Sequence, residues 1–377
     1  MKMIKKEISE FFLSKSDQFN YYKDTVKKLK NKNKKLISEK KDLTKKCQKL
    51  NEEKTALEKE LSKYSRLYIL NKLKNNEYKD LTISIKSPNP VFQKNWGDYF
   101  FALTLKKYFE RKGFNVLVQE RENWYECNEE IDITIVLRGY AYEYFPDINH
   151  INVMWNLYNP HIISNEEFEK YDYIFVASEK CARKIKNKTN KPVETLLQCT
   201  DPEVFYPEFK KELEEDILFV GNTRGYFRKI IQDVLHTDYD VSIYGAEWES
   251  YVDEKYLKGE FIPNEELHKY YSSCKILLND HLDTMKKYDY ISNRLFDALA
   301  CETLIISDEV SSIDLFEGAV VTYDGVDDLN EKIKFYLNND EERRLKVGKG
   351  RKIVLDNHTF EKRVEYILNC LKNIKME

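Results

Sequence analysis

The stretch "YISNRLFDALACETLIISD" (residues 290–308) joins a helical pattern directly to a strand pattern. Apolar residues recur at helical spacing over 293–301, and a compact β-branched run follows at 303–307. A single residue, Glu302, separates the two patterns. The stretch therefore predicts a helix that feeds at once into a buried strand, a unit typical of α/β domains built on parallel sheets.

Three polar features of this unit are not needed for packing. Ser292 or Asn293 can cap the helix, and Arg294 then lies in its first turn, where the helix dipole disfavours a cation unless an anion is near. Asp297, one turn further on, can accept hydrogen bonds from two hydroxyls of a ribose if it faces a cleft. An exposed Arg294–Asp297 pair at i,i+3 explains the same residues, and the sequence alone leaves both interpretations open.

The chain has 377 residues, of which 42% are hydrophobic, so two domains and an appendage are expected. The net charge of −3 is unevenly distributed. Residues 1–64 carry 19 Lys against 10 Asp and Glu, a net +9, which leaves −12 for the rest. A basic arm thus precedes an acidic body. A solvated helix surface explains the arm's charge, and contact with anionic lipid is the alternative.

The cysteines argue against a disulfide or zinc framework. There are seven, an odd number, and no two stand in a CxxC spacing. They are expected to be reduced thiols of a cytoplasmic protein. No signal peptide opens the chain and no apolar run reaches the ~18 residues of a membrane span, so any membrane association is expected to be peripheral, through the arm.

The arm carries a leucine heptad. The d positions of this heptad are Leu29, Leu36, Leu43, Leu50 and Leu57. The a positions include Asn33, Lys40 and Lys54. Leu at d with one polar Asn at a is typical of a parallel two-stranded coiled coil, although the lysines weaken the seam and leave a trimer open. Residues 22–64 therefore predict a homo-oligomer, with a single solvated helix as the alternative.

Beyond the arm, short apolar strands alternate with amphipathic helices in two consecutive series. The first series begins with "LTISIK" (81–86), and the second begins with "DILFVG" (216–221). This alternation predicts parallel sheets with right-handed crossovers. The predicted fold class is α/β, with two Rossmann-like doubly wound domains after an α-helical coiled coil. The predicted ranges are an arm at 1–75, a first domain at 80–200 and a second domain with C-terminal helices at 201–377.

The first strand of the second series is followed by a basic, glycine-containing loop, "GNTRGYFRK" (221–229). Gly221 and Gly225 allow backbone to approach a ligand, and the charges lie at a helix start, where free N–H groups and the dipole favour anions. The loop is neither a Walker A motif nor GxGxxG, and a solvated basic turn would account for it equally well.

Taken in order, several motifs resemble the C-terminal half of group 1 glycosyltransferases, and more narrowly their CgeB-like, spore-maturation-like branch. These motifs are "LLQCTDPEVFYP", "ILFVGNTRGYFRKI", "VSIYGAEW", "ILLNDH", "YISNRLFDALACETLIISD" and "HTFEKRVEYIL". In addition, "INVMWNLYNPHIISNEEFEKYDYIFVAS" is similar to the N-terminal half of that branch. The resemblance covers roughly residues 82–370 and leaves out the arm.

The resemblance implies a GT-B architecture, in which the C-terminal domain holds a nucleotide-sugar donor. By position it implies that Asp297 is the acidic ribose ligand and that the basic loop faces the diphosphate. Asp289 stands where many relatives place a Glu that contacts the donor sugar, and Glu302 replaces a usual Gly. The full set of predicted donor-binding residues is Gly221, Asn222, Arg224, Arg228, Lys229, Asn279, His281, Asp289, Ser292, Asn293, Arg294 and Asp297.

Two residues of the first domain are candidates for the catalytic base. Asp98 lies in "NWGDYF" (95–100) at a strand-to-helix junction, where capping or beginning the helix is its alternative role. His161 in "WNLYNPH" follows another strand, and an imidazole is suited to acid–base work near neutral pH. Either could deprotonate an acceptor hydroxyl if the reaction inverts the anomeric centre.

The predicted function is metal-independent glycosyl transfer from a nucleoside diphosphate sugar to a glycan, lipid-linked or protein acceptor. No cofactor and no nucleic-acid partner are expected. "DYD" (238–240) has the form of a metal-binding DxD, but it precedes a strand at the end away from the cleft and is interpreted as a turn. The alternatives are a nucleotide-sugar epimerase or hydrolase on the same fold, and a non-catalytic sugar-binding scaffold organised by the coiled coil.

Overall fold

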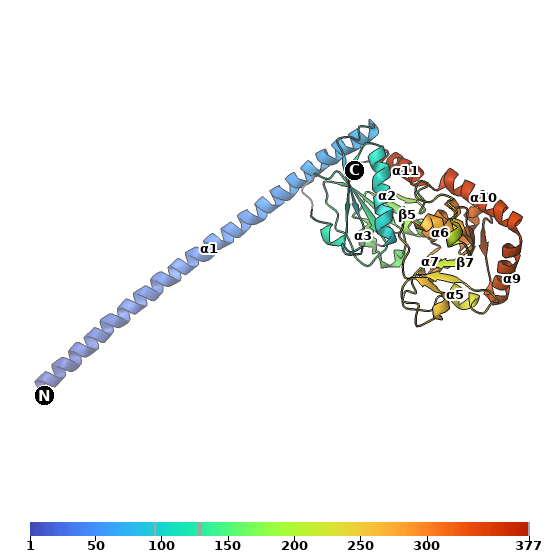
Figure 1. The fold of residues 1–377 in the computed structure, drawn as a ribbon. Helices are drawn as coiled ribbons and strands as arrows, with labels where there is room; N and C mark the ends of the chain where they lie inside the picture. Colours follow the sequence, from blue (N-terminus) through green and yellow to red (C-terminus); the bar gives the residue numbers. More distant parts are fainter. Residues whose placement is uncertain (94–95, 127–129, 376–377) are drawn as a thin grey trace. The chain divides into compact units, whose positions relative to one another are not determined.

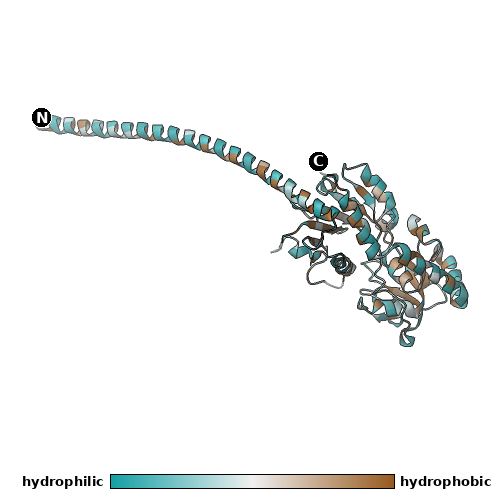
Figure 2. Ribbon diagram, turned by 90° about the horizontal axis from the view of Figure 1, so that it is seen from above, coloured by the Kyte–Doolittle hydropathy of each residue, from teal (hydrophilic) through white to brown (hydrophobic). Residues whose placement is uncertain are grey.

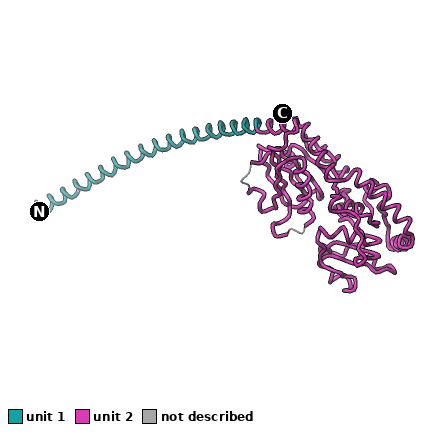
Figure 3. Tube along the Cα trace, turned by 45° about the horizontal axis from the view of Figure 1, so that its top comes forward, with its two compact units in different colours: residues 1–64 teal, residues 65–377 magenta. Residues whose placement is uncertain are grey.

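The computed structural model describes residues 1–93, 96–126 and 130–375. Asn95 of the motif "NWGDYF" and Cys127 lie outside these described residues. The chain forms two compact units, residues 1–64 and residues 65–377, shown in different colours in Figure 3. The helices and strands are labelled in Figure 1.

The first unit is a single helix. Helix α1 (Lys2–Lys74) comprises all of this unit after Met1 and continues into the second unit. Figure 2 shows that hydrophilic residues predominate along it, interrupted by hydrophobic ones. All five heptad leucines are exposed in the single chain. The coiled coil itself remains a prediction.

The last turns of α1 belong to the globular unit. Ile69, Leu70 and Leu73 are buried in the core of its first sheet, and Arg66 forms an ion pair with Asp172. The apolar residues of α1 before the globular unit therefore include an exposed heptad. Ile69, Leu70 and Leu73, within the globular unit, face its core instead.

The globular unit holds two six-stranded sheets, and the strand pairs formed by the described residues are all parallel. The first sheet has the order β2-β1-β3-β4-β5-β6 and the second β12-β11-β10-β7-β8-β9. The first-sheet strands are β1 (Thr82–Lys86), β2 (Asn115–Gln119), β3 (Ile133–Arg138), β4 (Ile151–Asn156), β5 (Tyr173–Val176) and β6 (Val193–Thr195). The second-sheet strands are β7 (Glu215–Val220), β8 (Ser242–Tyr244), β9 (Leu257–Gly259), β10 (Cys274–Asn279), β11 (Leu304–Ser307) and β12 (Val320–Thr322). The predicted two-domain α/β fold is confirmed.

Helices connect the parallel strands. The α-helices after α1 are α2 (Gly97–Arg111), α3 (Asn165–Phe168), α4 (Glu179–Lys186), α5 (Lys229–Val234), α6 (Leu267–Ser273), α7 (Asp283–Tyr288), α8 (Asn293–Ala300), α9 (Gly325–Asn338), α10 (Asp340–Asn357) and α11 (Phe360–Lys372). Short 3₁₀ turns are η1 (Arg121–Asn123), η2 (Pro160–Ile162), η3 (Lys211–Leu213), η4 (Glu254–Tyr256) and η5 (Ser311–Phe316). The opening stretch forms α8 and β11, as its pattern predicts.

The last helix differs from the predicted domain boundary. The range 201–377 assigned α11 to the second domain, but Phe360, Val364 and Leu368 lie in the apolar core of the first sheet. The ring centroids of Phe101 on α2 and Phe360 are 4.7 Å apart. Helix α11 has one apolar face, and that face is buried against α2, so the chain crosses back to the first sheet at its end.

Two further findings concern cysteines and membranes. The six described cysteines are all free thiols, and four of them are buried. Among the described residues, no helix is both long and apolar enough to span a bilayer.

Candidate donor and acceptor site

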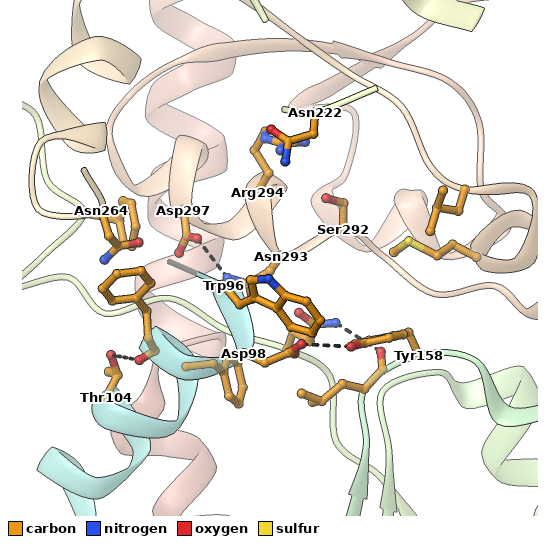
Figure 4. A pocket seen from close by; sticks show the side chains of 18 of the residues that line it. Trp96, Asp98, Thr104, Tyr158, Asn222, Asn264, Ser292, Asn293, Arg294 and Asp297 are labelled. Carbon is orange, nitrogen blue, oxygen red and sulfur yellow. Dashed lines mark hydrogen bonds between the residues drawn. The ribbon is translucent and has the colours of Figure 1, made fainter. Parts of the chain in front are cut away.

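A cavity of about 870 Å³ lies where the carboxyl ends of the two sheets meet, as expected for ligand sites in doubly wound folds. Its walls come from segments that follow β3, β4, β6, β7 and β10, together with the starts of α2 and α8. Figure 4 shows Asp98, Tyr158 and Trp96 on one side and Asn222, Arg294 and Asp297 on the other. Eight of the predicted site residues line the cavity: Asp98, Asn222, Arg224, Arg228, Ser292, Asn293, Arg294 and Asp297.

Three guanidinium groups converge on the second-domain wall, from Arg224, Arg228 and Arg294. The pKa of Arg224 is lowered, first by partial desolvation and then by the positive charges of Arg228 and Arg294. No hydrogen bond or ion pair reaches the Arg224 side chain from the described residues. Of these three guanidinium groups, only one is paired with a carboxylate among the described residues. The wall therefore carries a net positive charge.

Arg228 is the neutralised cation. It is buried at the N-terminus of α5 and forms a two-pronged ion pair with Asp280, which follows β10 and also lines the cavity. Its Nη1 also donates to the carbonyl of Asn222 at 3.2 Å. Asp280 was not predicted, although its neighbours Asn279 and His281 were.

Glycines allow the backbone around this loop to pack closely. A Cβ at Gly221 would lie 2.8 Å from Nη1 of Arg228, and one at Gly245 would lie 2.2 Å from the carbonyl oxygen of Gly221. The Gly221 carbonyl in turn accepts the indole N–H of Trp248 at 2.8 Å. Gly221 therefore lies beside the arginine cluster, and its backbone supports the loop.

Arg294 is held in place from β10. Its Nη1 donates to Oδ1 of Asn279 at 3.2 Å, and Asn279 in turn donates to Ser307 at 2.9 Å. The buried Nε of Arg294 has no hydrogen-bond partner among the described residues, and neither does Oδ1 of Asn293. Buried polar atoms without partners are rare, and these two are available to a ligand in the cavity.

Asp297 does not form the surface pair with Arg294 that the sequence left open. Its Oδ1 accepts from the Thr200 hydroxyl at 2.7 Å, and its Oδ2 accepts from Nδ2 of Asn293 at 2.8 Å. Burial raises the pKa of this carboxyl to about 7, against the opposing effects of those two hydrogen bonds and of Arg294. An ionised carboxylate accepts about four hydrogen bonds, so capacity remains for a ligand.

Across the cavity, Asp98 lies in the first turn of α2 and accepts a hydrogen bond from the Tyr158 hydroxyl at 2.8 Å. Burial raises the pKa of Asp98, while the bond from Tyr158 and the charge of Arg224 act in the opposite direction. The carboxyl of Asp98 does not cap its helix, and the preceding Trp96 provides no side-chain cap either. Asp98 therefore begins the helix, as its alternative role has it, without capping it.

The remaining predicted residues lie off the cavity wall. Lys229 pairs with Asp233 on α5 at 2.6 Å, and His161 is exposed and stacks on Tyr288 at 5.5 Å between centroids. His281 is buried, with Nδ1 2.6 Å from Asp308.

Asp289 and Glu302 take up structural positions. Asp289 adopts a left-handed conformation at the end of α7, and its carboxylate accepts from the backbone N–H and hydroxyl of Ser312. Glu302, where relatives were expected to have Gly, is not among the cavity residues and lies 3.6 Å from Arg351. The charge expected near the cleft is therefore on another surface.

Metal-binding side chains do not cluster in the parts of the chain that the structure describes: no group of three or more His, Cys, Asp or Glu is placed to hold an ion. Asp238 and Asp240 precede β8, at the end of that strand opposite to Tyr244. Asp240 is exposed, with Lys255 at 3.5 Å.

Comparison with known proteins shows a similarity that covers part of the chain. Residues 224–369 match the model of a family described as glycosyl transferase-like. The spore protein CgeB of Bacillus subtilis (strain 168) is 26% identical over 162 residues, which are 39% of this chain and 50% of that protein. The second half of the chain is thus similar to glycosyl transferase-like proteins, and a stretch of it is similar to CgeB. The match spans about half the length of CgeB.

Two solved structures have a fold similar to that of this chain. A DNA-modifying beta-glucosyltransferase, studied with and without uridine diphosphoglucose, has a TM-score of 0.51 and 14% identity, covering 78% of this chain and 99% of that chain. An OtsA apo structure has a TM-score of 0.55 and 9% identity, covering 79% and 100%. At these identities the similarity establishes the GT-B fold alone.

Proposed function

We propose that the protein transfers a sugar from a nucleoside diphosphate sugar to an acceptor hydroxyl. The observation that supports this most directly is the convergence of Arg224, Arg228 and Arg294 on one wall of the cavity, with one carboxylate, Asp280, paired among them. Such a wall suits a diphosphate, because guanidinium groups bind phosphate oxygens and stabilise the charge that develops as the diphosphate departs.

The neighbouring residues suit the rest of the donor. Asp297 lies on the same helix as Arg294, one turn further on, and would accept hydrogen bonds from the ribose hydroxyls. The unpartnered Nε of Arg294 and Oδ1 of Asn293 would gain partners from the donor. Departure of the diphosphate would then be assisted by side chains, without a required metal ion, and we expect activity to survive a chelator.

The acceptor would approach from the first-domain wall. Asp98 would take the proton of the acceptor hydroxyl if the reaction inverts configuration, since a carboxyl with a raised pKa is a stronger base than an ordinary one. If the reaction retains configuration, the departing phosphate would take that proton. His161 is a weaker candidate, because its ring stacks on Tyr288 outside the cavity wall.

Nucleotide binding tests this proposal. Calorimetric titration of the full chain with UDP, GDP and dTDP should show binding of at least one, and Arg294→Ala should weaken it by about tenfold or more. Lys229→Ala is the matched control, because Lys229 pairs with Asp233 off the cavity wall, and its affinity should equal that of the wild type. Absence of binding to all three nucleotides would contradict the proposal and favour a non-catalytic scaffold.

The type of reaction is tested separately. The protein is incubated with donors, including uridine diphosphoglucose, with and without candidate acceptors. A transferase consumes donor chiefly when an acceptor is present. Conversion of the donor alone would instead indicate an epimerase or hydrolase on this scaffold.

A further inference from the structure

The first-domain wall of the cavity carries a pair of aromatic rings that the apolar cores do not use. Trp96 and Tyr140 both line the cavity, with centroids 5.4 Å apart and planes at 58°. Tyr140 is 39% exposed. Neither ring belongs to any of the four apolar clusters formed by the described residues. Core packing therefore does not account for this aromatic pair.

The aromatic surface extends beyond the cavity. Tyr142 lies 5.6 Å from Tyr140, with the ring planes 30° apart, and the guanidinium of Arg121 lies 4.3 Å from the Tyr142 ring. That guanidinium also donates to Glu122 at 2.6 Å, so its charge is compensated. A ligand leaving the cavity along these residues would meet a second flat ring and no uncompensated charge.

The charge of this wall excludes several classes of acceptor. The cavity residues contributed by the first domain include no Lys or Arg among the described residues. Asp98 is a carboxylate, and the other acidic residue nearby, Asp201, is already bound by Lys107 and Tyr108. A phosphorylated lipid or a nucleic acid would meet no first-domain cation on this wall, and its phosphate would lie beside the carboxyl of Asp98.

A neutral sugar ring fits the same wall. One face of a pyranose presents C–H groups that pack on an aromatic ring, and its edge presents hydroxyls. Asn159 and Gln198 lie in the same cavity with amide groups that pair with such hydroxyls. Trp96 and Asp98 both line the cavity, so a sugar on Trp96 would share it with the carboxyl of Asp98.

We propose that Trp96 and Tyr140 form the binding subsite for a neutral sugar of the acceptor, so that the acceptor is a glycan. This inference rests on the proposed function, because it assigns the second substrate of the same cavity. Tyr142 continues the subsite for a longer chain of sugars.

Tryptophan fluorescence reports on this subsite. The protein has four tryptophans, and Trp124, Trp155 and Trp248 are buried at 4%, 0% and 0% exposure, so a bound sugar alters chiefly the emission of Trp96. The full chain is titrated with maltohexaose, cellohexaose and chitohexaose without nucleotide. A saturable change is expected with at least one. Tyr140→Ala should weaken that binding about tenfold, because a stacked aromatic ring is lost.

Phe145→Ala is the matched control. Phe145 is an exposed aromatic residue, five positions after Tyr140 and outside the cavity, and its loss should leave the affinity unchanged. Melting curves establish that both variants fold. The inference is overturned if no hexasaccharide gives a saturable change, if Tyr140→Ala binds as tightly as wild type, or if only dodecyl phosphate or an oligonucleotide binds.

The two proposals fail in different ways. Sugar binding without any nucleotide binding would support the subsite and contradict glycosyl transfer. Nucleotide binding without sugar binding would support the donor site and overturn the subsite.

Discussion

Tyr158 connects the candidate base to the backbone of the first domain. Its ring lies against Gly139, where an added Cβ would come within 2.8 Å of two ring carbons. Its hydroxyl donates to Asp98 at 2.8 Å. Glycine at position 139 therefore allows the ring to lie where the hydroxyl reaches Asp98, which makes Tyr158 a positioning residue for that carboxyl.

Tyr158→Phe is expected to shift the pH profile of the transfer reaction. The hydrogen bond stabilises ionised Asp98, so its loss raises the pKa of Asp98 further. The acidic limb of kcat/KM should move to higher pH. Gly139→Ala, which displaces the ring, should move it in the same direction. An unmoved limb in both variants would remove Asp98 from the role of base.

Asp297 makes folding stability depend on pH. Its pKa is raised to about 7 in the folded protein, so the folded state holds this proton more tightly than the unfolded chain does. Its contribution is favourable below the unfolded pKa and is lost as the pH rises through about 4 to 7. In Asp297→Asn, the free energy of unfolding, measured by urea denaturation, should fall less over this pH range than it does in the wild type. Parallel curves for the two proteins would show that the carboxyl titrates normally.

The positions of residues at a helix start were predicted better than the directions of side chains at a strand end. For Arg294 and Asp297 the residues alone left a surface pair open, and the resemblance favoured the cavity wall on which both lie. Asn279 and His281 flank Asp280, and at a strand end neighbouring side chains point to opposite faces. Asp280 therefore faces the cavity and its neighbours do not. Sequence does not reveal which of two alternating sets faces a ligand.

At the scale of elements, the backbone is strained at the end of α8. Glu302 has φ 59°, and the hydrogen bonds from its N–H to Leu299 and from Thr303 to Ala298 form a Schellman motif. This motif favours Gly at the left-handed position. Glu302, where relatives were expected to have Gly, thus stands at a position whose backbone conformation favours Gly.

Glu302→Gly is expected to stabilise the protein. A left-handed conformation costs a non-glycine residue about 1–2 kcal/mol, and the added freedom of Gly in the unfolded chain offsets about 0.4–1 kcal/mol of the relief. The net gain should be about 0.5–1 kcal/mol in thermal or urea unfolding. Glu302→Ala, which removes the contact with Arg351 without relieving strain, should show no gain. A Gly variant that melts at or below the wild-type temperature would be inconsistent with this account.

The arm is expected to oligomerise through its heptad. Replacing the exposed d residues Leu36 and Leu43 by Glu should yield monomers in light scattering, because two carboxylates would face each other in the seam. The matched control makes the same replacement by Glu at Ser38 and Lys45, which are f positions, and it should keep the wild-type mass. An unchanged mass in the d variant would show that the globular unit, or a different face of α1, holds any oligomer together.

Element types were predicted better than element ends. Most strands were identified, including the three-residue β6 and β8, whereas the equally short β9 and β12 were not. The partner of α11 was also missed, since an amphipathic helix shows which face is buried but not against which sheet.

At the scale of the globular unit, residues 65–377, the two sheets are tied at two places. One tie is the crossing of the chain near Thr200, which pairs with Thr359 just before α11. The other is the end of α7 together with the segment that links it to α8. There the carbonyl of Tyr288 accepts from Ser178 at 2.7 Å, and the hydroxyl of Tyr290 donates to Asn156.

These ties predict that the two sheets of this unit unfold together. Calorimetry of the protein should show one transition for the globular unit, coincident with the loss of near-ultraviolet dichroism. A nucleotide that binds the second-domain wall should raise that single transition temperature. Two resolved transitions, of which only one responded to nucleotide, would show that the ties are weak.

The segment between α7 and α8 has a consequence for the entropy of binding. It leads directly into the helix that carries Ser292, Arg294 and Asp297, so anchoring Tyr290 on the first domain also fixes the start of that helix. A hinged cleft loses conformational entropy when its ligand binds. Here that entropy has already been lost during folding. A pre-organised cleft of this kind should bind its first substrate with little change in heat capacity, because little additional apolar surface is left to close over it.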